Sequence, residues 1–213
     1  MKKIPYEIVY EDESILVVYK NRDVFSVATD DIKTKNHNLF FYLKRYAASN
    51  GEKVFLVHRL DYETSGIMIF AKNYETQQYL KDYFENRTVI RLYEAVVKEK
   101  LQDSYHKEVN LKLSQNESGK VYIDDVSGKE AITIVDYLNP IQIGSALKIE
   151  IKTGRKNQIR ISLHSLGLTL IGDKRYSSDI AKRMYLNAYY LSFPKNDILK
   201  KNEFFINPLW IKL

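Results

Sequence analysis

A stretch of fifteen residues, His58 to Lys72, gathers the side chains with the clearest potential for chemistry. Its sequence, HRLDYETSGIMIFAK, places Arg59 and Asp61 just before a Thr64-Ser65-Gly66 turn and an apolar run. A short turn beside a buried strand can hold one carboxylate at the edge of a cleft, because rigid backbone fixes its position. Asp61 is therefore the candidate reactive group. The pattern by itself favours a simpler interpretation, in which Asp61 only caps the turn.

The elements that must position this stretch are short strands interrupted by helices. Apolar runs and period-two alternation predict two strands between Tyr6 and Tyr19 and further strands at 54–57, 67–71, 89–98, 107–113, 120–125, 129–138, 145–153 and 184–193. Helical spacing predicts one helix that starts at Asn36 or Asn38, one after Asn73 and one over 159–166 that stops at Gly167. Residues 20–37 are polar and predict a loop. Turns are expected at Ser118-Gly119, Ser127-Gly128 and Asn139-Pro140.

This order of elements predicts an α+β fold with a mixed, mostly antiparallel central sheet, flanking helices and a catalytic cleft. Many strands are adjacent in sequence, as in antiparallel hairpins, and a glycine loop that could cradle phosphate is absent from the sequence. No linker, repeat or low-complexity segment divides the chain. We therefore expect residues 1–213 to form a single domain.

Composition excludes several classes of protein. The 213 residues are 45% hydrophobic, which is ordinary for a globular domain. There is no cysteine and there are four histidines, so disulfides, iron–sulfur clusters and thiolate zinc sites are excluded and a histidine-rich metal centre is disfavoured. Pro5, Glu7 and Glu11 interrupt the start of the chain where a signal peptide needs an apolar stretch. A cytoplasmic location fits these features.

Charge and aromatic content fit a nucleic-acid partner. Lysine and arginine outnumber acidic residues by 33 to 27, and this excess accompanies 17 tyrosines and 9 phenylalanines. Cationic side chains can contact phosphates, while aromatic rings can stack on exposed bases. A coding bias towards lysine and tyrosine would leave the same composition, so charge alone decides nothing.

Four blocks together carry a family resemblance. They are the stretch from His58 to Lys72, RLYEAVV at 91–97, TGRKNQIRISLHSLGLTLIGDKRY at 153–176 and RMYLNAYYLSFP at 183–194. In this order they resemble the RluA-type family of RNA pseudouridine synthases, over residues 6 to 194. The resemblance implies a cofactor-free isomerisation without a metal, in which a uridine in RNA becomes pseudouridine.

The resemblance also implies roles for three residues. Asp61 is the catalytic carboxylate, acting as nucleophile at C1′ or as base at C2′, and a carboxylate can stabilise positive charge at a sugar carbon. Arg160 matches the family's arginine, which would pair with Asp61 and favour its charged form. Tyr93 matches the tyrosine that stacks on the target base. Without the resemblance, Arg160 reads as a helix-surface residue and Tyr93 as part of the core.

Two further residues and the partner follow from the same resemblance. Arg59 would lie where the target nucleotide leaves the RNA stack, and Leu186 would form an apolar floor of the pocket, although an ordinary core leucine has the same signature. The expected partner is ribosomal RNA, foremost that of the large subunit, or transfer RNA. We expect a monomer without a membrane partner. Many relatives carry an N-terminal S4-type RNA-binding module, which this chain has no room for, so its own cationic surface would bind RNA.

The chain departs from the family pattern in four places. Asn157 and Asn187 stand where histidines are usual, Leu168-Thr169 replaces a usual His-Pro, and the segment after Tyr19 lacks the customary Lys-Pro-Ala-Gly turn. We expect these changes to leave Asp61, Tyr93 and Arg160 untouched. They would alter loop geometry and substrate choice more than the reaction.

Two alternatives remain open from the sequence. An N-glycoside hydrolase would use Asp61 with Glu63 or Asp173 as a second carboxylate and would release free uracil. An RNA-binding or RNA-folding factor would have lost catalysis at the altered positions. Asp61→Asn would then be as functional in cells as the wild type.

Overall fold

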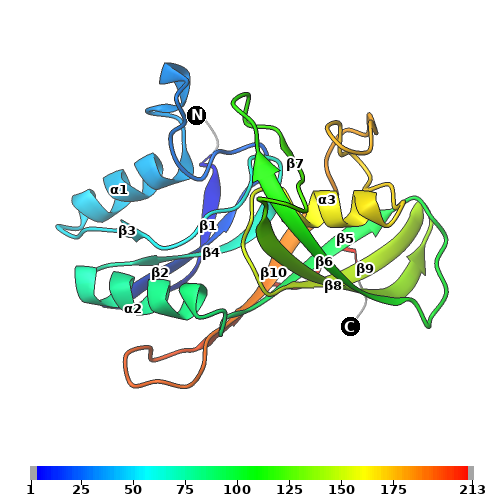
Figure 1. Cartoon of the computed structure of the whole chain (residues 1–213). Helices are drawn as coiled ribbons and strands as arrows, with labels where there is room; N and C mark the ends of the chain where they lie inside the picture. The colour runs from blue at the N-terminus through cyan, green and yellow to red at the C-terminus, as the bar shows by residue number, and fades with distance from the viewer. Residues whose placement is uncertain (1–3, 211–213) are drawn as a thin grey trace. The chain divides into compact units, whose positions relative to one another are not determined.

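The computed structural model describes residues 4–210, which divide into two compact units (Figure 1). The first unit comprises residues up to 89 together with 190–206, and the second comprises 90–189 together with the chain after 206. Neither unit is one continuous stretch of chain. This explains why the sequence contains no linker.

The strands of the first unit include the end of the stretch that carries Asp61. β1 (Tyr6–Glu11) pairs antiparallel with β2 (Ile15–Lys20), and β2 pairs antiparallel with β4 (Ser65–Ala71). Every residue of β4 is buried, as its apolar sequence predicts for a strand covered on both faces. The strand predicted at 54–57 is shorter, since β3 covers Phe55–Leu56, which pairs with β4.

Two helices of the first unit begin at asparagine caps, and of the two starts predicted for the first helix the structure uses Asn38 rather than Asn36. α1 (Leu39–Ser49) follows Asn38, whose side chain accepts a hydrogen bond from Phe41 N, and α2 (Tyr74–Glu85) follows Asn73, which accepts one from Thr76 N. Each cap satisfies a backbone N–H that the first turn leaves without a helical partner. The predicted loop at 20–37 is confirmed apart from Lys20, which ends β2, and the short 3-10 helix η1 (Ile32–Thr34).

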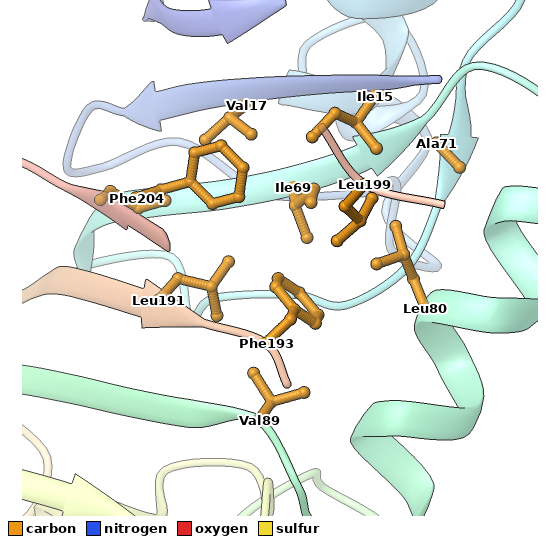
Figure 2. Close-up of a cluster of buried hydrophobic side chains, with 11 residues drawn as sticks. Ile15, Val17, Ile69, Ala71, Leu80, Val89, Leu191, Phe193, Leu199 and Phe204 are labelled. Carbon is orange, nitrogen blue, oxygen red and sulfur yellow. The ribbon is translucent and has the colours of Figure 1, made fainter. Parts of the chain in front are cut away.

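The core of the first unit joins these strands to the tail of the chain (Figure 2). β11 (Glu203–Phe205) pairs antiparallel with the end of β10 (Leu186–Ser192). Phe204 is 1% exposed and packs in the same cluster as Ile69 of β4 and Leu80 of α2. The prediction that the tail docks is therefore confirmed for its described part, while residues 211–213 lie outside the described residues.

The second unit holds five antiparallel strands in the order β5-β9-β8-β6-β7. Their bounds are β5 Ile90–Val97, β6 His106–Gln115, β7 Val121–Ile123, β8 Lys129–Ile141 and β9 Gly144–Ile151. The predicted turn at Asn139-Pro140 is wrong, because both residues continue β8 after a register shift. Proline is tolerated there because the pairing of β8 with β6 ends at Asp136, so no ladder bond to β6 requires an N–H from Pro140.

α3 (Gln158–Ser165) packs against β6 and β8 (Figure 1). It ends where predicted, at Gly167, whose φ of 72° suits the left-handed position after a helix. The segment after α3 contributes an isolated bridge between Leu170 and Val97. All strand pairings described here are antiparallel, and three α-helices accompany them in the described residues, which confirms the predicted α+β class.

Candidate active site

Asp61 lies in a turn that the first unit holds rigidly. Thr64 N donates to Asp61 O at 3.2 Å, which closes the turn just before β4. The preceding residue, Leu60, is buried, and Ser26 fixes its backbone at both ends: Oγ donates to Leu60 O at 2.7 Å and accepts from Leu60 N at 3.1 Å. Asp61 itself is half-buried and Arg59 is exposed. The half-buried carboxylate is therefore carried by fixed backbone.

Lys20 holds this turn through hydrogen bonds to its backbone. The sequence contains no indication of this structural role. It is the last residue of β2 and its side chain is fully buried. Its ammonium donates to three backbone carbonyls: Asn21 at 3.1 Å, Val24 at 2.8 Å and Tyr62 at 3.2 Å. Burial lowers the pKa of Lys20 to about 7, although the charge of nearby Asp61 opposes the shift. The residue after Asp61 is thereby tied to the end of β2.

Aromatic contacts fix both flanks of the turn. The Tyr62 ring lies 4.4 Å from that of Phe25, measured between centroids. His58 stacks on Phe84 of α2 at 4.7 Å, and its Nε2 accepts a hydrogen bond from Ile69 N at 3.1 Å. His58 therefore has a structural part, which leaves Asp61 as the candidate reactive group of the motif.

Tyr93 and Leu186 belong to the second unit. Tyr93 lies on β5, opposite Ile149 of β9, and is 8% exposed. Arg91 shares its face and is also buried, with Nη2 donating to Lys152 O at 3.1 Å. Burial lowers the pKa of Arg91, while its proximity to Tyr93 opposes the change. Like Lys20, Arg91 is a buried cationic residue to which the sequence interpretation assigned no role.

Gly154 makes room for Arg91. A Cβ added at this glycine would lie 2.9 Å from Arg91 Nη1, closer than ordinary contact allows. The absence of a side chain at Gly154 therefore permits close approach of the guanidinium.

Arg160 is a buried residue of α3 and forms a two-bond ion pair with Asp173. Nε donates to Asp173 Oδ2 at 2.9 Å and Nη2 to Oδ1 at 2.6 Å. The side chains are 3% and 0% exposed. Burial alone would raise the pKa of Asp173, but the hydrogen bond and charge of Arg160 outweigh it and the pKa is lowered. Asp173 is thus committed to Arg160, which weakens the hydrolase interpretation that uses it as a second carboxylate.

One expectation about the family departures is wrong. Asn157, expected to leave Arg160 untouched, contacts it directly: Arg160 Nη1 donates to Asn157 Oδ1 at 3.2 Å. The two residues lie three apart, with Asn157 just before α3 and Arg160 in its first turn, so the altered side chain reaches the guanidinium. Asn157 therefore belongs to the surroundings of Arg160.

The other altered asparagine, Asn187, lies on β10, the strand next to β5 in the sheet. Asn187 Nδ2 donates to Glu94 Oε1 at 2.7 Å, and the same carboxylate accepts from the backbone N–H groups of Leu209 and Trp210. This buried carboxylate anchors residues 209–210. The neighbouring Leu186 is 2% exposed, and its role as a pocket floor remains a prediction.

The candidate residues therefore fall into two groups. Arg59 and Asp61 lie in the first unit, and Tyr93, Arg160 and Leu186 lie in the second. The predicted pairing of Arg160 with Asp61 also remains a prediction. A cavity of about 420 Å³, lined by residues between Lys100 and Lys107, includes none of these side chains.

Comparison with known proteins identifies the family. Residues 14–165 match the family model described as RNA pseudouridylate synthase, and this span contains Arg59, Asp61, Tyr93 and Arg160. The chain belongs to this family. Its RluA-type resemblance is thereby confirmed, and the reaction class is an isomerisation of uridine to pseudouridine in RNA.

Individual relatives of this pseudouridine synthase agree with the assignment. It is 33% identical over 207 residues to the ribosomal large subunit pseudouridine synthase C of Rickettsia bellii, covering 95% of the chain and 67% of the relative. It is 28% identical over 211 residues to the ribosomal large subunit pseudouridine synthase D of Zymomonas mobilis, covering 97% and 66%. The chain thus spans about two thirds of these relatives' length.

A solved structure supports the fold. Human RNA pseudouridylate synthase domain containing 1 superposes with a TM-score of 0.72 at 25% identity, covering 91% of this chain and 80% of that one. The predicted pseudouridine synthase fold is confirmed. Within residues 4–210, no helix is both long and apolar enough to span a membrane.

Proposed function

We propose that the chain converts a specific uridine of large-subunit ribosomal RNA to pseudouridine, with Asp61 as the catalytic carboxylate. The observation that carries the proposal is the Asp61 turn, held by Lys20 and Ser26 within the family-matched segment. The names of the relatives above support ribosomal RNA as the substrate. Transfer RNA is the alternative, and it becomes an outcome of the test.

The reaction leaves the elemental composition of the nucleotide unchanged. The bond between N1 and C1′ breaks, the uracil turns, and C5 bonds to C1′. C5 then loses its hydrogen and N1 gains one, so the mass of the RNA does not change. Asp61 would either attack C1′ or remove a proton from C2′, and both roles require its ionised form.

The remaining candidates supply binding and orientation. Arg160 would pair with Asp61, and Tyr93 would stack on the uracil, which a flat ring permits while the base turns. The exposed Arg59 would occupy the place that the extruded nucleotide leaves, and Leu186 would close the pocket. The proposal needs both units to act on one nucleotide, so we propose that they form a single catalytic domain.

The net charge of the chain leads to an expectation about RNA binding. A net charge of +6 favours RNA phosphates, so binding should weaken as salt rises. We propose that the enzyme acts in the cytoplasm as a monomer, without a cofactor or a metal ion.

Mapping pseudouridines across total RNA from cells with and without the gene tests the substrate. We expect at least one site in large-subunit ribosomal RNA to disappear and to return on complementation. Loss confined to transfer RNA would overturn the ribosomal assignment. A map without any lost site would overturn the proposed function, and free uracil from purified enzyme would point to hydrolysis.

A further inference from the structure

Asn157 and Tyr176 surround the Arg160 guanidinium, although the proposed reaction assigns neither of them a part. Asn157 Oδ1 accepts from Arg160 Nη1 at 3.2 Å, and Asn157 Nδ2 donates to Tyr176 Oη at 3.1 Å. Arg160 Cζ lies 5.3 Å from the centre of the Tyr176 ring. The three side chains therefore form a closed ring of contacts.

The hydrogen bonds of this ring run in one fixed direction. Tyr176 Oη–H donates to the Val121 carbonyl at 3.2 Å, and a carbonyl can only accept. The Tyr176 oxygen is thus an acceptor for Asn157, whose other amide atom must accept from Arg160 because a guanidinium only donates. An amide supplies the donor and the acceptor that these two neighbours require. A carboxylate would lack the donor.

The backbone presents the Asn157 amide in this direction. Asn157 has φ 54° and ψ 19°, in the left-handed region, immediately before α3, and it is 3% exposed. Asparagine tolerates this conformation better than most residues. The residue type therefore satisfies both the backbone and the hydrogen bonds.

The ring complements the ion pair with Asp173. The two bonds to Asp173 fix one edge of the guanidinium but allow its plane to tilt about that edge. Asn157 holds Nη1, on the other edge, and the Tyr176 ring lies against the guanidinium. Together these contacts determine the plane of the group.

We propose that Asn157 and Tyr176 are positioning residues, which set the orientation of the Arg160 guanidinium for the reaction. The proposal rests on the proposed function, in which Arg160 pairs with Asp61. The backbone carbonyl of Val121 in β7 accepts from the Tyr176 hydroxyl and so anchors the ring.

The test measures tritium release from uridine labelled at C5, in large-subunit ribosomal RNA prepared from cells that lack the gene. Asn157→Gly removes the amide but keeps the left-handed backbone free of strain. Asn157→Asp keeps the shape but removes the donor. Both should lower kcat by about tenfold to a hundredfold, with KM changed by less than about threefold, because misorientation affects chemistry more than binding. Tyr176→Phe should also lower kcat, because it removes the hydroxyl that accepts from Asn157.

Matched controls separate this role from general damage. Asn110→Gly removes an exposed asparagine on β6, and Tyr122→Phe removes an exposed hydroxyl next to Val121. Both should keep wild-type kcat. Circular dichroism should show that all variants are folded at the assay temperature.

A double-mutant cycle shows whether Asn157 acts through Arg160. In an Arg160→Lys background the oriented group is gone, so Asn157→Gly should cost no more than about twofold. Additive losses, or a kcat of Asn157→Gly within about twofold of wild type, would overturn the positioning role. If the wild type itself releases no tritium from any RNA of the deletion cells, the proposed function fails instead.

Discussion

Replacing Asp173 by asparagine should destabilise the fold, because it removes the negative charge beside the buried Arg160 guanidinium. Both side chains are almost fully buried, and two hydrogen bonds join them. Removing one partner of such a pair costs about 3–5 kcal/mol, since the other charge stays buried. Asparagine keeps one oxygen, which can still accept from Arg175 N and Tyr176 N, so the loss is concentrated at Arg160.

Urea unfolding followed by circular dichroism measures this loss. With a slope of about 2 kcal/mol per molar urea, the midpoint should fall by about 1.5–2.5 M. Asp136→Asn is the matched control, because Asp136 also accepts from Lys148 at 3.2 Å and from His106 at 2.6 Å, but near the surface. That control should cost less than about 1 kcal/mol.

Acid supplies an independent check of the same pair. The pKa of Asp173 is raised by burial but lowered overall by Arg160, so the folded value lies below the unfolded one, about 3.9. Its stabilisation is therefore fully present above that value and is lost as pH falls through the lower folded pKa. The stability difference between wild type and Asp173→Asn should be constant from about pH 7 to 5 and shrink below about pH 4. A difference under about 1 kcal/mol, or one that persists in acid, would refute this account of the pair.

Substitutions at Lys20, Tyr93 and Glu94 test separate parts of the structure. Lys20→Met should lower tritium release by about tenfold or more, whereas Lys72→Met, which removes a half-buried lysine paired with Glu11 and Glu52, should not. Because burial lowers the Lys20 pKa to about 7 from 10.5, wild-type stability should also rise with pH across that window, and Lys20→Met should lack this rise in urea titrations. Tyr93→Phe should retain most activity while Tyr93→Ala loses about 1–3 kcal/mol of stacking in single-turnover assays, and equal losses would assign the role to the hydroxyl. Glu94→Ala should lower the free energy of unfolding by about 3 kcal/mol or more, measured in urea, because three N–H groups lose this acceptor; an unchanged midpoint would show that the tail is not anchored there.

Local signals in the sequence predicted the elements whose causes are local. Asn38 and Asn73 mark helix starts because a cap needs only its own first turn. Pro140 misled the turn prediction, because the effect of a proline on a strand depends on which side has a neighbour, and that is a tertiary property.

The surroundings of the candidate site were harder to predict. The motif singled out Asp61, but nothing in the sequence indicated that Lys20 is buried, because its carbonyl partners include Tyr62, 42 residues away. In the same way, the commitment of Asp173 to Arg160 joins a loop to a helix 13 residues earlier. A lysine after an apolar run and an aspartate in a polar loop are typical of exposed positions, and only long-range packing makes them interior.

Tritium release by purified wild type and Asp61→Asn, on C5-labelled ribosomal RNA from cells that lack the gene, tests the central claim most directly. The wild type should release tritium, since C5 loses its hydrogen when it bonds to C1′. Asp61→Asn should release none above background while still binding the RNA. Release by Asp61→Asn at the wild-type rate would contradict the assignment of Asp61 as the catalytic carboxylate.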